Sequence, residues 1–265
     1  MAATMFLGEP RRSELAQLVY APHATESFTV RSVGSSTPLG TLPCGTPSDV
    51  TEAAQRARAA QHAWAAMPPY FRLASLRRFP NLLDAHSGIV SAVLRGEAGL
   101  SPQTAYDRVF EIAAECQRVT DRGLKALRPV KRRSGLRVRS VEHHAPLGLI
   151  GVVPNPVTGF DPMTAIAALL AGNALLLVPE GAGSYGTLLL AQFCHAARLP
   201  RDLVQVVPGP TGLADVAIGQ VDHLVVSPAG ERGQQLWRLA GQRGIGVTAN
   251  GSPDPVDYTT MVTKG

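Results

Sequence analysis

The chain has 265 residues, of which 45% are hydrophobic and 17% are charged. This composition supplies a large buried core and excludes a wholly disordered protein. No apolar run approaches the roughly 18–20 residues that span a bilayer, and the N-terminus has no signal-peptide pattern. The three cysteines lie far apart without CxxC spacing, which is typical of reduced thiols. We therefore expect a cytoplasmic protein without a membrane segment.

Positive charge is concentrated in residues 118–139, although the net charge of the whole chain is only +5. Such a stretch can contact phosphates or an acidic partner. However, no aromatic residues interleave with these lysines and arginines, and no nucleic-acid-binding motif accompanies them. A solvated helix end followed by a hairpin is the favoured interpretation, and nucleic-acid binding is not expected.

The first half of the chain predicts a β-hairpin followed by a layer of helices. Apolar residues within 28–42 flank a Gly- and Pro-containing turn, as in a hairpin. A helix start follows, because Thr46 is a good N-cap, Pro47 suits the first helical position and Asp49 suits the first turn. The helices are expected over residues 13–20, 46–66, two segments within 71–94, and 101–127.

The second half predicts strands alternating with helices. Apolar and polar residues alternate over 136–146, which indicates a half-exposed ribbon. Five short apolar runs then alternate with helical stretches, and such βαβ units form parallel sheets. The sequence thus predicts an α/β fold: a doubly wound, parallel, five-stranded Rossmann-like sheet, preceded by a helical layer and carrying a protruding β ribbon. The strands are expected at 149–153, 174–178, 203–207, 223–227 and 245–248.

These patterns divide the chain into five segments. The tail has β-forming residues at every second position from Val256 to Val262, so it could add a strand to the ribbon. A disordered tail after Pro253 and Pro255 is the alternative. The segments are a lead-in (1–26), a hairpin with the helical layer (27–135), the ribbon (136–147), the Rossmann-like domain (148–251) and the tail (252–265).

Several segments together resemble the aldehyde dehydrogenase superfamily. They are PLGLIGVV at 146–153, AGNALLLVP at 171–179, LPRDLVQVVPG at 199–209 and the strand–helix segment at 39–68. The match extends from about residue 28 to 251. Part of it would also suit the acyl-CoA and glutamyl-phosphate reductases, which share the fold.

The resemblance implies a site for a nicotinamide cofactor, NAD or NADP. The cofactor would lie against Pro154, Pro179, Glu180 and Gly209. Asn155 takes the place of the asparagine in the family's Pro-Trp-Asn signature, whose amide donates to an oxyanion, and is the candidate catalytic residue. The tryptophan is absent here, and capping a turn before Pro156 is an equally good role for Asn155.

Other positions depart from the family pattern. Val178 replaces the lysine of Lys-Pro-x-Glu, whose acid is displaced from Gly181 to position 180. Pro228 replaces the glycine of Thr-Gly-Ser, which removes a backbone donor, and Asn250 replaces the general-base glutamate. Losing two hydrogen bonds to charged groups weakens binding by roughly 10²–10⁴-fold. We therefore expect no tightly bound cofactor.

The family's catalytic cysteine belongs to a second half, and its members are nearly twice as long as this chain. None of Cys44, Cys116 and Cys194 has a matching context. His143 and His144 would point to opposite faces of a strand, so no metal site is expected.

The prediction is a truncated aldehyde-dehydrogenase-like protein, inactive alone, that acts as a structural or regulatory subunit. The alternative is an NAD(P)-dependent oxidoreductase half whose partner supplies the cysteine domain. The expected partner is a second copy or an aldehyde-dehydrogenase-type subunit.

Overall fold

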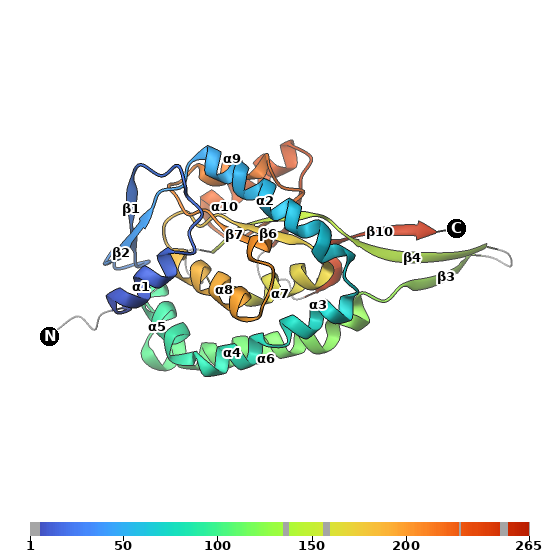
Figure 1. Ribbon diagram of the computed structural model, residues 1–265, viewed down its shortest axis with the longest axis horizontal. Coiled ribbons are helices and arrows are strands. Elements are labelled where there is room, and N and C mark those ends of the chain that lie inside the picture. Colours follow the sequence, from blue (N-terminus) through green and yellow to red (C-terminus); the bar gives the residue numbers. More distant parts are fainter. Residues whose placement is uncertain (1–5, 135–137, 156–159, 228, 250–253, 265) are drawn as a thin grey trace.

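The computed structural model describes residues 6–134, 138–155, 160–227, 229–249 and 254–264. Its centre is a five-stranded parallel sheet, as the alternation of strands and helices predicts (Figure 1). The strand order is β7-β6-β5-β8-β9. These strands are β5 (Leu149–Val153), β6 (Ala174–Leu177), β7 (Val204–Val206), β8 (His223–Val226) and β9 (Gly246–Ala249).

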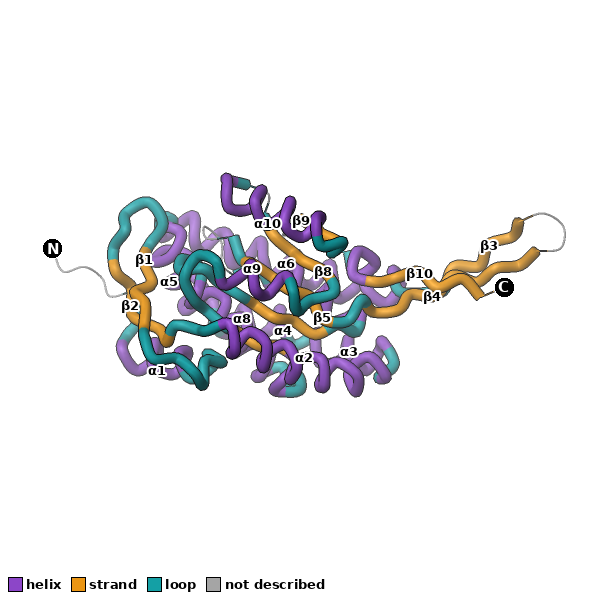
Figure 2. Tube along the Cα trace, turned by 90° about the horizontal axis from the view of Figure 1, so that it is seen from above, coloured by secondary structure: helices purple, strands orange, loops and turns teal. Residues whose placement is uncertain are grey.

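Helices cover both faces of this sheet, so the doubly wound prediction is confirmed (Figures 1 and 2). α7 (Pro162–Ala171) and α8 (Ser184–Ala196) lie on one face. The other face carries α2 (Pro47–Ala66), α9 (Leu213–Ile218) and α10 (Gly230–Gln242). The outer helical layer packs on α7 and α8 and consists of α3 (Pro69–Leu76), α4 (Phe79–Ala85), α5 (Ser87–Ala98) and α6 (Pro102–Ala126).

Some helix boundaries differ from the prediction. α1 spans Glu9–Ala16 rather than residues 13–20, because Pro10 falls in its first turn, where a missing N–H costs nothing. Three helices rather than two lie between α2 and α6, because Pro80 opens α4 and cannot continue α3. The hairpin of β1 (Ser27–Arg31) and β2 (Pro38–Pro43) forms as predicted.

The ribbon has three antiparallel strands in the order β10-β4-β3. They are β3 (Val130–Ser134), β4 (Val138–Pro146) and β10 (Thr259–Lys264), so the ribbon begins at Val130, before the expected boundary at residue 136. The C-terminal strand pairs with β4 along its whole length, from Thr259 opposite Pro146 to Lys264 opposite Val141. The tail therefore adds to the ribbon, as its alternating pattern suggested.

The C-terminal end of α7 is buried, and side chains from other elements donate to its backbone carbonyls. Every residue of α7 except Met163 is buried, so water cannot satisfy the carbonyls that a helix end leaves unpaired. The bonds are Gln61 Nε2 to Gly172 (3.0 Å), Trp64 Nε1 to Leu169 (2.7 Å), Arg72 Nε to Leu170 (2.9 Å) and Asn173 Nδ2 to Ala168 (2.9 Å).

Asn173 also joins this helix end to two other parts of the chain. Its Oδ1 accepts from the Gly148 amide (2.9 Å), just before β5, and its Nδ2 donates to the Tyr258 carbonyl (3.0 Å). Tyr258 is fully buried and ends the short 3₁₀ helix η2 (Pro255–Tyr258) that leads into β10. The C-terminal segment is therefore anchored in the core.

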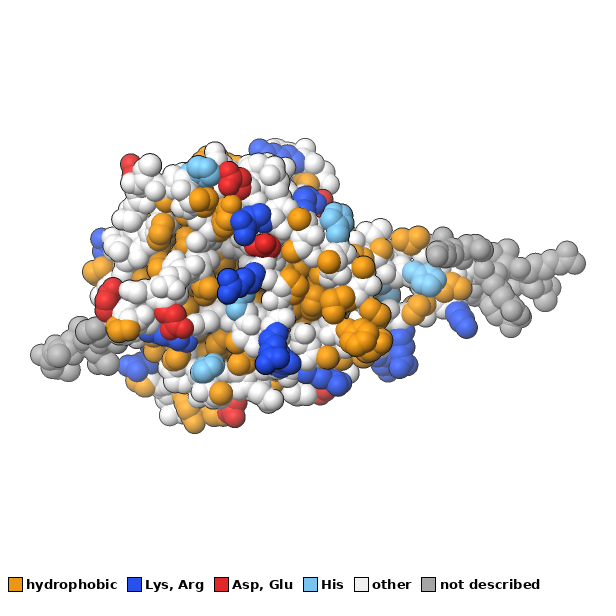
Figure 3. All heavy atoms as spheres, in the orientation of Figure 1, with side chains coloured by type: hydrophobic (Ala, Val, Ile, Leu, Met, Phe, Trp, Pro, Cys, Tyr) orange, Lys and Arg blue, Asp and Glu red, His pale blue; other side chains and the backbone are white. Residues whose placement is uncertain are grey.

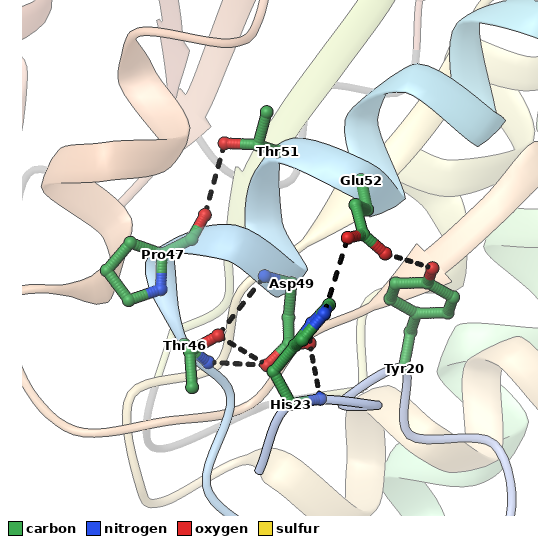
Figure 4. A network of polar contacts seen from close by, with 7 residues as sticks. All are labelled: Tyr20, His23, Thr46, Pro47, Asp49, Thr51 and Glu52. Atoms are coloured by element: carbon green, nitrogen blue, oxygen red, sulfur yellow. Dashed lines mark hydrogen bonds and ion pairs between the residues drawn. The ribbon is translucent and has the colours of Figure 1, made fainter.

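A polar network fastens the lead-in to the start of α2 (Figure 4). Asp49 is fully buried and accepts from the Thr46 amide (2.8 Å) and from the His23 backbone (3.0 Å) and ring (2.8 Å). Burial alone would raise the pKa of Asp49, but the hydrogen bonds from Thr46 and His23 lower it. The hydrogen bond between the His23 ring and Asp49, together with the negative charge of Glu52, raises the pKa of His23.

Charged side chains are spread over the surface. On the face seen in Figure 3, Lys and Arg side chains lie at separate places, some of them beside Asp and Glu. From the basic stretch, Arg118, Arg122, Lys125, Arg128 and Lys131 are exposed on the last turns of α6 and the start of the ribbon. Among the helices of the described residues, none is long and apolar enough to cross a membrane.

Glu97 is a buried carboxylate that caps a helix. It lies near the end of α5, is 3% exposed, and accepts from the amides of Tyr185 and Gly186 (2.8 Å each) in the first turn of α8. Burial raises the pKa of Glu97 to about 7 from 4.5, against the lowering effect of these hydrogen bonds.

A Glu97→Gln variant tests this cap through the pH dependence of stability. Because the pKa of Glu97 is raised, folded protein holds its proton between pH 4.5 and about 7 while unfolded protein releases it. The free energy of unfolding should thus fall by about 3 kcal/mol over that range in the wild type relative to the variant. Urea titrations at several pH values measure this, with Glu111→Gln on exposed α6 as control. Equal pH slopes for all three proteins would contradict it.

Candidate nucleotide-type pocket

A pocket of about 340 Å³ lies at the carboxyl ends of β5, β6 and β8. The chain proceeds from β5 through β6 to β7 on one side and then returns to place β8 on the other side of β5. Ligands of doubly wound folds bind at such a reversal of strand order. The lining residues include Val153, Pro154, Asn155, Glu180, Ala182, Thr211, Ser227, Ala229, Gly230, Glu231 and Arg232.

The predicted site residues divide into two groups. Pro154, Asn155 and Glu180 line the pocket. Pro179 and Gly209 are not among its lining residues; they lie on two adjacent segments joined by an isolated parallel bridge, where the Gly209 amide donates to the Pro179 carbonyl (3.2 Å). A Cβ on Gly209 would come within 2.6 Å of the Leu213 side chain, so this glycine serves close packing of α9.

Both oxygens of the Glu180 carboxylate are hydrogen-bonded within the protein. Its side chain is 7% exposed, and Oε1 accepts from the amides of Gly212 (2.8 Å) and Ala214 (3.2 Å) at the start of α9. Arg232 from α10 donates Nη2 to Oε1 (2.6 Å) and Nε to Oε2 (2.8 Å). The oxygens that the resemblance assigns to a cofactor are therefore hydrogen-bonded within the protein.

Arg232 is a pocket residue that the sequence reasoning missed. Its Nη1 lies 3.2 Å from an Asp215 oxygen and donates to Gln235 (3.1 Å), and its bonds to Glu180 raise the pKa of its guanidinium. A signal was present, because a positive charge in the first turn of a helix opposes the helix dipole. An arginine at that position therefore indicates an acidic partner nearby.

The positions that depart from the family pattern are arranged as follows. Val178 is 1% exposed and belongs to the core. Gly181 has a φ of +86°, a conformation that side chains other than glycine rarely adopt. Ala229 lines the pocket at the start of α10. Pro228 and Asn250 lie outside the described residues.

The three thiols lie away from the pocket. Cys116 and Cys194 are fully buried in α6 and α8, and burial raises the pKa of both far above the usual range. Cys44, before α2, is half-buried, and burial together with Glu26 raises its pKa. A nucleophilic thiol needs the opposite, a lowered pKa in an accessible setting.

Comparison with known proteins adds the evolutionary relationship. The family model described as "Aldehyde dehydrogenase family" matches residues 20–250. A protein of Mycolicibacterium smegmatis named as a succinate-semialdehyde dehydrogenase (NADP+) is 33% identical over 249 residues, which make up 91% of this chain and 47% of that protein. An N-succinylglutamate 5-semialdehyde dehydrogenase of Sphingopyxis alaskensis is 31% identical over 206 residues, 76% of this chain and 43% of its own.

Solved structures agree with the fold. A betaine aldehyde dehydrogenase of Staphylococcus aureus superimposes with a TM-score of 0.79 at 15% identity, over 92% of this chain and 51% of that one. An NAD-dependent benzaldehyde dehydrogenase of Corynebacterium glutamicum gives 0.75 at 19% identity, over 87% and 52%. The chain thus spans about half the length of the relatives it matches.

Thiol labelling tests whether the cysteines are buried and unreactive in the folded protein. At pH 8 the folded protein should react with a disulfide reagent at Cys44 alone, and slowly, because only thiolates attack and the other two thiols are buried. In denaturant all three should react. Mass spectrometry of the labelled protein identifies the sites, and fast labelling of Cys116 or Cys194 without unfolding would refute the assignment.

Proposed function

The chain belongs to the aldehyde dehydrogenase family, and on this basis we propose that it is a non-catalytic member that acts as a structural or regulatory subunit. The residues that line the pocket support this proposal. The glutamate that would hold a cofactor is bound to Arg232, and none of the three thiols is among the lining residues.

The described residues do not fit a nicotinamide dinucleotide. Ribose hydroxyls donate to acceptors such as a carboxylate, but Glu180 Oε1 already accepts three hydrogen bonds and Oε2 is bonded to Arg232 Nε. A pyrophosphate would meet the carboxylates of Glu180 and Glu231 among the lining residues, and the guanidinium of Arg232 is already paired with Glu180 and Asp215. Binding of NAD or NADP should therefore be weak.

The ribbon supports the assembly part of the proposal. β10 and β3 are its two edge strands, with no further strand beside them in the part of the chain that the structure describes. Val130, Met261 and Val262 expose between 42% and 49% of their surface there. Open edges with apolar side chains favour pairing with another chain. We propose a homodimer through the ribbon, with two-fold symmetry.

A steady-state assay tests the absence of catalysis. The purified chain should oxidise no member of an aldehyde panel with either NAD or NADP, because Cys116 and Cys194 are buried and Cys44, whose pKa is raised, is not among the lining residues of the pocket. The control is a full-length dehydrogenase under the same conditions. Turnover that Cys116→Ala or Cys194→Ala abolishes would overturn the proposal.

Light scattering tests the dimer. Met261→Lys with Val262→Lys should give monomers, because two ammonium groups would have to be buried at the ribbon edge. Substitutions are preferred to a truncation of the C-terminal segment, because that segment includes the fully buried Tyr258. Tyr70→Lys, at an exposed aromatic on α3, is the matched control and should leave the mass unchanged. A monomeric wild type, or a double variant that stays dimeric, would show the idea to be wrong.

A further inference from the structure

The Arg232 side chain ties three elements together across the pocket. It starts in the first turn of α10, bonds to Glu180 after β6, and reaches Asp215 on α9. Arg232 is 27% exposed and Glu180 only 7%. The ion pair therefore forms part of the inner wall of the pocket and is not a surface contact.

The first turn of α10 also lines the pocket. α10 begins at Gly230 without a side-chain cap on its first amides, and Ala229, Gly230 and Gly233 line the pocket. Uncapped amides at the start of a helix are suited to phosphate oxygens. The remaining volume of about 340 Å³ is at the low end for a small-molecule site.

We propose that Arg232 determines which ligands this pocket admits, by holding Glu180 in an internal ion pair that excludes dinucleotides. This inference rests on the proposed function. It attributes the weak binding of NAD and NADP to the ion pair between Arg232 and Glu180, which substitution can remove. A dinucleotide would have to displace the Arg232 side chain. It would also leave the buried Glu180 carboxylate without its counter-ion, and breaking a buried pair in this way is strongly unfavourable.

The ion pair predicts an order of affinities among variants. Arg232→Ala opens the space but leaves the negative charge of Glu180 facing a phosphate. Glu180→Gln with Arg232→Ala removes both charges and keeps an oxygen to accept from the Gly212 amide. NADP and NAD should therefore bind the double variant at least 10-fold more tightly than the wild type, with the single variant between them.

Isothermal titration calorimetry with NAD, NADP and ADP measures this order. Arg238→Ala is the matched control, because Arg238 is an exposed arginine of the same helix whose side chain donates only to the Gln234 carbonyl. It should bind like the wild type. Circular dichroism and urea midpoints establish that each variant is folded. If the double variant is unstable, Glu180→Gln with Arg232→Gln, which also removes both charges, is measured under the same criterion.

The outcomes separate this inference from the proposed function. Folded variants whose affinities equal that of the wild type would overturn the role of Arg232 and leave the absence of catalysis standing. A wild type that binds NADP as tightly as the double variant would overturn it too. Aldehyde turnover by the wild type would instead refute the proposed function, whatever the order of affinities.

Discussion

The buried end of α7 is the constraint on which the rest of the structure depends. A helix that ends inside a protein leaves carbonyls that cost about 1–3 kcal/mol each if unpaired, a large share of a typical stability of about 5–15 kcal/mol. Here the donors come from α2, α3 and Asn173. Because Asn173 also bonds to Gly148 and Tyr258, the helical layer, the sheet and the C-terminal segment are positioned by one set of hydrogen bonds.

The fold and the residues that line the pocket depend on different interactions. The sheet is stabilised by buried apolar strands and by helices on both faces, and neither depends on the residues at the carboxyl ends. Those ends are free to vary. In this chain the acid after β6 caps α9 and pairs with Arg232, so a residue suited to a ligand serves the protein's own packing.

The ribbon and the core are linked through Tyr258. Because this residue is fully buried against the sheet and α7, β10 leaves the core in a fixed direction and pairs with β4 in a defined register. The ribbon then protrudes with two open edges (Figure 2). A surface of that kind is suited to assembly, which is consistent with a member whose role is structural.

The sequence by itself determined the fold class, the five strands and most helix positions, because periodicity and caps such as Thr46 and Ser101 are local signals. The family resemblance singled out Glu180 and Asn155, and both line the pocket. Only the tertiary structure decided that Glu180 is paired, because Arg232 lies 52 residues away along the chain. The boundaries around Pro10 and Pro80 were likewise missed, since a proline can end one helix or open the next and packing selects between them.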